Sequence, residues 1–166
     1  MCGISGYIGN KDAYPIIING LKRLEYRGYD SAGVLMYDGA EINLSKTKGK
    51  VSALEEITNK DPKRKEGNIG IGHTRWATHG VPNDVNSHPH LSQSGDLAIV
   101  HNGIIENYDT LRKELISRGY TFQSDTDTEV LVNLIEEVKK QEKCKLGKAV
   151  QNSTDSSIRC LRNCRF

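Results

Sequence analysis

The sequence predicts a domain of the α+β class. Strand-like and helix-like segments follow one another in mixed order, whereas a parallel α/β fold would alternate them regularly. The length of 166 residues is enough to bury a core and is short for two domains. No internal repeat is visible. We therefore expect one domain with layers of sheet and helix.

The first half of the chain carries four predicted segments. They are a strand at 2–8, a helix opened by Asp12 and Pro15 and closed by Gly28, a hairpin of strands at 31–37 and 41–48, and a short helix at 51–57. Ile17, Leu21 and Leu24 share one face of the first helix. Asp38-Gly39 is a dipeptide that suits a tight hairpin turn. The polar run at 59–68 is expected to be a solvated loop.

The second half predicts strands at 69–74 and 96–101, separated by a long segment rich in Gly, Pro, Asn and His. Loops of that length inside compact domains are usually functional or disordered. Two helices should follow. The first is capped by Asn107, carries Leu111, Leu115 and Ile116, and ends at Gly119; the second begins at the capping-box pattern of Thr126 and Glu129.

The composition excludes several classes of partner. The 23 basic and 21 acidic residues give a net charge of +2, and the basic residues are spread rather than clustered. We therefore expect no nucleic-acid partner. The sequence has no secretion-like start and no run of 18 apolar residues, so we expect no membrane association and a cytoplasmic location.

The most informative cysteine is Cys2, which is followed by glycine. Removal of Met1 would make Cys2 the N-terminal residue and free its α-amino group. An α-amino group titrates at about 7.7–8.0 and a thiol at about 8.5, so the amine can accept the thiol proton. One residue would then supply both nucleophile and base. The alternative for an isolated cysteine is a buried structural role.

Five ordered segments carry a family resemblance. They are Met1-Cys-Gly-Ile4, Leu24 to Gly33, His73-Thr-Arg-Trp-Ala-Thr-His-Gly80, Val100-His-Asn-Gly103 and Ser124-Asp-Thr-Asp-Thr-Glu129. Together they resemble the class II glutamine amidotransferases, which implies the four-layer αββα sandwich of the N-terminal-nucleophile hydrolases. The segments at 86–90 and 101–107 are similar to those of the hexosamine-forming synthases in that family, which belong to amino sugar biosynthesis.

The resemblance implies a catalytic set for glutamine hydrolysis. The Cys2 thiolate would attack the side-chain amide of L-glutamine and form a thioester, with release of ammonia. The side-chain amide of Asn102 and the backbone N–H of Gly103 would bind the oxyanion. From the residues alone, Asn-Gly at the end of a strand also fits a simple turn.

The resemblance also implies how the two charged ends of glutamine are bound. Arg75 would hold the carboxylate, with Thr78 and His79 alongside, and Asp127 rather than Asp125 would accept from the ammonium. Trp76 would help to cover the path by which ammonia leaves, although core packing is an equally good interpretation of a single tryptophan.

The resemblance implies no metal and no cofactor. All five histidines lie between positions 73 and 101, but no cysteine or carboxylate spacing completes a tetrahedral site, so His88 and His90 are expected to shape the long loop. The partners that it implies are L-glutamine and, through a separate isomerase domain absent from this chain, fructose 6-phosphate. The full-length enzyme would be a homo-oligomer.

The resemblance covers residues 1–151 and ends there, which leaves the fold incomplete at its C-terminus. If the tail is back-translated and one base is deleted just after the Gln151 codon, the new reading frame can encode QIALIQVFGAYAIAV. This is close to the expected apolar continuation. We therefore interpret 152–166 as a frameshifted tail, with an ordinary disordered terminus as the alternative. A second interpretation of the whole chain is an inactive fragment or a glutamine-binding module.

Overall fold

A computed structural model describes the backbone of residues 2–76 and 81–163, with side chains described as far as residue 154. The chain forms two compact units. The first comprises residues up to 89 together with 99–102, and the second comprises residues 90–98 and those from 103 onward.

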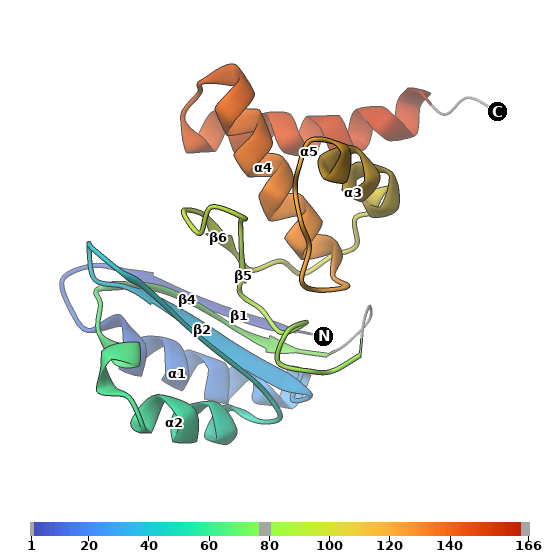
Figure 1. The fold of residues 1–166 in the computed structure, drawn as a ribbon. Helices are drawn as coiled ribbons and strands as arrows, with labels where there is room; N and C mark the ends of the chain where they lie inside the picture. Colours follow the sequence, from blue (N-terminus) through green and yellow to red (C-terminus); the bar gives the residue numbers. More distant parts are fainter. Residues whose placement is uncertain (1, 77–80, 164–166) are drawn as a thin grey trace. The chain divides into compact units, whose positions relative to one another are not determined.

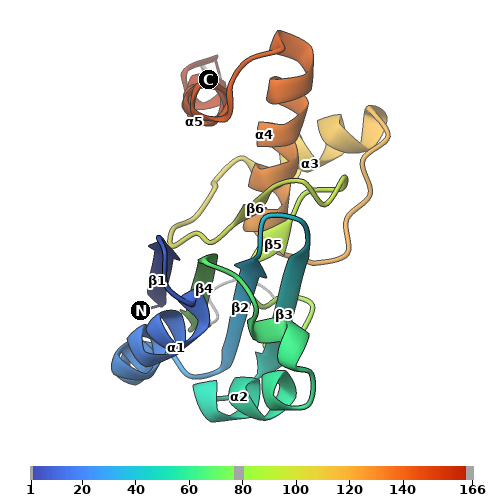
Figure 2. The ribbon, with the colours of Figure 1, turned by 90° about the vertical axis from the view of Figure 1, so that its left-hand side faces the viewer.

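The first unit contains a four-stranded antiparallel sheet with two helices on one face (Figure 1). Its elements are β1 (Gly3–Ile8), α1 (Ala13–Leu24), β2 (Ser31–Tyr37), β3 (Ile42–Lys48), α2 (Val51–Asn59) and β4 (Ile69–Arg75). The strand order is β1-β4-β2-β3, which Figure 2 shows side by side. The last strand in sequence therefore lies inside the sheet, between β1 and β2.

The core of the first unit lies between the sheet and the helices. Alternate residues of β2 point toward α1 and α2, as the two-residue period of a strand requires. The buried cluster contains Ala13, Tyr14, Ile17, Ile18, Leu21, Ala32, Val34, Met36, Val51 and Leu54. The predicted face of the first helix is thus confirmed for Ile17 and Leu21, whereas Leu24 is only half-buried.

The hairpin between β2 and β3 turns where the sequence predicts. Gly39 has a φ of 102°, a conformation that glycine adopts without steric cost. The Asp38 carboxylate accepts the N–H groups of Ala40 and Glu41 at 2.8 and 2.7 Å. These backbone hydrogen bonds hold the pKa of Asp38 below its usual value.

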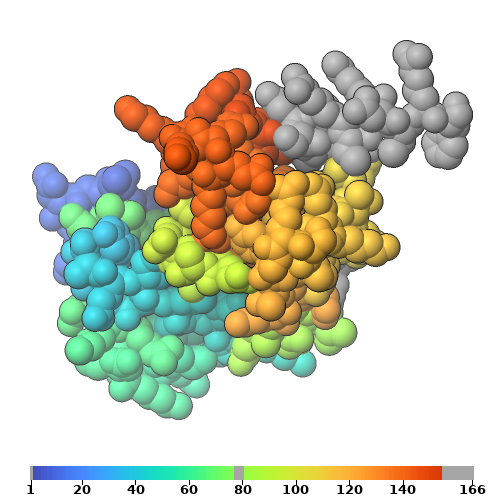
Figure 3. Space-filling view, turned by 45° about the horizontal axis from the view of Figure 1, so that its top comes forward, coloured from blue at the N-terminus to red at the C-terminus, as the bar shows by residue number. Residues whose placement is uncertain are grey.

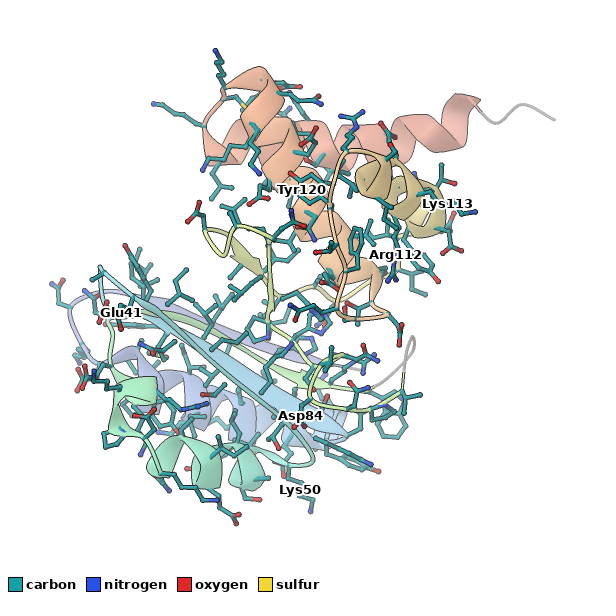
Figure 4. The ribbon with its side chains drawn as sticks, in the orientation of Figure 1. Glu41, Lys50, Asp84, Arg112, Lys113 and Tyr120 are labelled. Atoms are coloured by element: carbon teal, nitrogen blue, oxygen red, sulfur yellow. The ribbon has the colours of Figure 1, made fainter. Side chains whose placement is uncertain are left out.

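The second unit contains a short two-stranded sheet and three helices, except that Ile99, the last residue of β6, is grouped with the first unit. These elements are β5 (His90–Leu91), β6 (Ala98–Ile99), α3 (Tyr108–Ser117), α4 (Asp127–Glu142) and α5 (Leu146–Asn163). Leu111, Leu115, Tyr120 and Val130 form its buried apolar cluster. Arg112 lies over the ring of Phe122, and the Tyr120 hydroxyl donates to Glu137 at 3.1 Å (Figure 4). Figure 3 shows α3 and the segment after it at the surface of this unit.

Several local predictions need correction. The strand expected at 96–101 is only two residues long, and its partner β5 lies in the segment predicted to be a loop. The solvated loop at 59–68 contains a short 3₁₀ helix, Pro62–Lys65. Asp12 and Asn107 occupy N-cap positions without a capping side-chain hydrogen bond, and Ile116 is exposed rather than in the core.

The helix α5 continues across residue 151, where the sequence predicts a changed frame or a disordered tail. The domain boundary at that residue stays a prediction. No helix among the described residues combines the length and the apolar character needed to cross a membrane.

Candidate active site

The pairing of β1 with β4 places Cys2 beside Trp76. Gly3 lies opposite Thr74 in the antiparallel register, so the residues just beyond these two strand ends are neighbours. The Trp76 backbone N–H donates to Cys2 Sγ at 3.2 Å, and the thiol lies 3.6 Å from the Trp76 carbonyl oxygen. Cys2 is half-buried, so its sulfur is held by backbone contacts without being enclosed in a core.

Asn102 lies next to Cys2, although the two residues are far apart in sequence. Its side-chain Nδ2 donates to the Cys2 carbonyl oxygen at 3.2 Å. Its Oδ1 lies 2.8 Å from His73 Nε2. The first unit therefore brings together the predicted nucleophile and the predicted side-chain donor of the oxyanion site.

His73 is buried, with 1% of its surface exposed. Burial, opposed by the hydrogen bond with Asn102 and assisted by the positive charge of Arg75, lowers the pKa of its imidazole to about 4. The ring is therefore neutral at pH 7 and carries one N–H. His73 and Arg75 are two residues apart on β4, so their side chains lie on the same face of the sheet.

Arg75 is the last residue of β4 and Trp76 follows it, and the two side chains lie in different environments. Arg75 is buried with 4% exposure, and its carbonyl oxygen accepts the Asp30 N–H at 3.2 Å. Trp76 is 47% exposed and meets Tyr29 edge-on, with ring centroids 5.4 Å apart. The interpretation of Trp76 as a core residue is therefore wrong.

Asp127 is the first residue of α4 in the second unit. It is buried, and its Oδ2 accepts the Ile105 N–H at 2.8 Å, whereas Asp125 is exposed. Gly103, which follows Asn102 in the chain, also belongs to the second unit. The proximity of Gly103 and Asp127 to Cys2 stays a prediction, and Thr78 and His79 lie outside the described residues.

The two histidines of the 86–90 segment have different neighbours. The His88 ring stacks on His73 with centroids 4.4 Å apart and an interplanar angle of 27°. His90 Nε2 lies 3.0 Å from the Thr126 hydroxyl, within the second unit. Across residues 2–76 and 81–163, no three His, Cys, Asp or Glu side chains are grouped as metal ligands would be.

Sequence reasoning missed two features of this site. It gave no role to His73, although the residue lies in a quoted motif and shares a sheet face with Arg75. It also missed the contact of Tyr29 with Trp76. The alternation along β4 is a signal for the first feature, whereas nothing local in the sequence pairs residues 29 and 76.

Comparison with known proteins defines the class. Residues 52–146, more than half of the chain, match the model of the glutamine amidotransferase domain. The chain belongs to this family. A solved glutamine phosphoribosylpyrophosphate amidotransferase from B. subtilis, complexed with ADP and GMP, superposes with a TM-score of 0.77 at 31% identity, over 93% of this chain and 33% of that chain. A solved allosteric regulatory enzyme of purine biosynthesis superposes with a TM-score of 0.79 at 30% identity, over 93% of this chain and 33% of that chain. The predicted α+β fold of the N-terminal-nucleophile type is confirmed.

The curated relatives are more specific. The chain is 63% identical over 136 residues to glutamine–fructose-6-phosphate aminotransferase (isomerizing) of Caldanaerobacter subterraneus subsp. tengcongensis, covering 82% of this chain and 22% of the relative. It is 61% identical over 160 residues to the enzyme of the same name from Bacteroides thetaiotaomicron, covering 95% of this chain and 26% of the relative. The chain thus spans about a quarter of the length of these relatives.

Proposed function

We propose that this chain is a glutaminase that hydrolyses L-glutamine through a thioester on Cys2. The observation that carries the proposal is the placement of Asn102 beside Cys2, since a donor next to a nucleophile is what acyl transfer requires. After removal of Met1, the free α-amino group takes the thiol proton. The thiolate attacks the amide carbon, the C–N bond breaks, and ammonia leaves with that proton. Water then cleaves the thioester to give glutamate and the free thiol.

The negative oxygen of the tetrahedral intermediate would be bound by two neutral donors. Asn102 Nδ2 is one, and the backbone N–H of Gly103 is the other. Loss of one such donor typically slows turnover by about 10²–10³-fold. The existing hydrogen bond from Nδ2 to the Cys2 carbonyl supports this role, because it shows the donor end of Asn102 directed at Cys2.

The charged ends of the substrate would be held by Arg75 and Asp127. A guanidinium presents two parallel N–H groups to a carboxylate, and the burial of Arg75 strengthens such a contact. Asp127 would accept from the ammonium. Thr78 and His79 would line the carboxylate site, and Trp76 would cover the exit of ammonia.

On a wider scale, we propose that the ammonia is delivered to fructose 6-phosphate on an isomerase domain outside these 166 residues. Identities of 61–63% to glutamine–fructose-6-phosphate aminotransferases support this assignment. The activity would be that of a cytoplasmic, homo-oligomeric transferase of amino sugar biosynthesis, with no nucleic-acid or membrane partner.

The test is release of ammonia and glutamate from glutamine by the purified chain, with Cys2→Ser as control. Turnover by the parent and none by the variant is the expected result. Calorimetric binding of glutamine without release of ammonia would instead identify an inactive glutamine-binding module. Intact mass after treatment with an electrophilic glutamine analogue, followed by peptide mapping, places the adduct on or off Cys2.

A further inference from the structure

We propose that His73 is a positioning residue that fixes the orientation of the Asn102 carboxamide, so that its NH₂ group faces the reacting amide of glutamine. This inference rests on the proposed function. It adds a residue to the site whose role is exerted through Asn102, without contact to substrate.

An asparagine side chain has two chemically different ends of nearly the same shape. Only one orientation of Asn102 presents N–H groups to an oxyanion; the opposite orientation presents the carbonyl oxygen and repels it. Asn102 is exposed, so water can satisfy either end. A fixed donor beside Oδ1 favours one orientation, the same one that the Cys2 carbonyl oxygen favours by accepting from Nδ2, and His73 Nε2 lies 2.8 Å from Oδ1.

The surroundings of His73 determine which ring nitrogen carries the proton. Its Nδ1 is buried and has no hydrogen-bond partner among the described residues. A buried N–H without an acceptor is rarer in proteins than a buried acceptor without a donor. The neutral ring therefore carries its proton on Nε2 and donates it to Asn102 Oδ1, which directs Nδ2 toward Cys2.

The position of the ring is fixed from the side by His88, which stacks on it. The backbone of His88 approaches β2 closely: a Cβ on Gly33 would lie 2.0 Å from the His88 carbonyl oxygen, so only glycine fits at position 33. The preceding loop is attached to β3, where the Asp84 carboxylate accepts the Lys48 N–H at 2.7 Å (Figure 4). The His73 ring is thus held by packing as well as by β4.

The kinetic test uses two variants of the full chain. His73→Leu removes the donor at similar volume, and His73→Gln replaces Nε2 by an amide N–H at a similar position. We expect His73→Leu to lower kcat roughly tenfold or more with KM within about twofold, and His73→Gln to recover most of the loss. In an Asn102→Ala background, His73→Leu should have no further effect on kcat, because the residue acts through Asn102.

Three results would overturn the proposal: a kcat of His73→Leu within twofold of the parent, His73→Gln as slow as His73→Leu, or losses that multiply in the double variant. A purely structural role would lower the thermal midpoint and persist without Asn102. If the variants do not fold, ¹⁵N NMR of the histidine-labelled parent decides, since a proton on Nδ1 of His73 contradicts the proposal. An inactive parent would reject the proposed function, whereas the NMR result does not depend on activity.

Discussion

Lowering the pH from 7 to 5 should destabilise the folded protein, because His73 is buried as a neutral ring. An unfolded histidine has a pKa of about 6.5, whereas burial lowers the pKa of His73 to about 4. Between these values the unfolded chain binds more protons than the folded one. The free energy of unfolding therefore falls as the pH falls through this window, and the contribution is fully present only above about pH 6.5.

The two pKa values set the size of the effect. Linkage gives a loss of about 2 kcal/mol at pH 5 relative to pH 7 and about 3 kcal/mol by pH 4. Three carboxylates with lowered pKa values also make the free energy of unfolding fall in acid, but mainly below their unfolded pKa values of 3.8 and 4.5. They are Asp38, Glu136 and Glu137. The interval from pH 7 to 5 therefore separates histidine titration from that of these carboxylates, and comparison with His73→Gln separates His73 from the other four histidines.

The assay is urea unfolding followed by far-UV circular dichroism at half-unit pH steps, on the parent and on His73→Gln. Glutamine does not titrate, so the variant should lose most of the slope between pH 7 and 5. Equal slopes in the two proteins would refute the reasoning, because the destabilisation would then arise from other groups.

The remaining predictions concern the substrate site and one helix start. The mature protein should lack Met1 by intact mass, and Cys2→Ala should abolish ammonia release while glutamine binding persists; hydrolysis by a protein that retains Met1 would remove the amine as base. Arg75→Ala and Asp127→Ala should each weaken calorimetric glutamine binding by about 1.5–3 kcal/mol. Asp125→Ala is the matched control, and a loss confined to that variant would mean that the wrong carboxylate was chosen. Thr126→Ala should lower the free energy of unfolding by about 1–2 kcal/mol, since its hydroxyl accepts the Glu129 N–H at the start of α4; an unchanged urea midpoint would count against that cap.

Local chemistry made most of the regular elements predictable. The period-two pattern of β2 and the periodic apolar face of α1 each specify an element within a few residues of sequence. The pairing of β5 with β6 was not predictable, because two-residue strands show no periodicity. The position of β4 between β1 and β2 depends on long-range pairing, which no local pattern specifies.

The candidate site likewise combines residues that the sequence identifies with a contact that only the folded chain reveals. Cys2, Arg75 and Asn102 were recognised from short motifs, and the first unit places Cys2 and Asn102 in direct contact. The link from Asn102 to His73 joins residues 29 positions apart, so it became visible only when the chain was folded. Motifs thus identify groups that react or bind, whereas the groups that orient them are found through packing.

At the start of α4, one short motif both caps the helix and fixes the chain that precedes it. The sequence predicted a capping box, and the Thr126 half is confirmed because its hydroxyl accepts the Glu129 N–H. The Glu129 carboxylate, however, accepts the N–H groups of Gln123 and Ser124 at 2.9 and 2.7 Å, so it fixes the chain before the helix. Asp127 lies between Thr126 and Glu129 in the chain, so its backbone is held by hydrogen bonds on both sides. Among the described residues, one of its oxygens accepts the Ile105 N–H and the other accepts from the Thr128 hydroxyl at 3.5 Å; the ammonium contact proposed above would be made by this second oxygen.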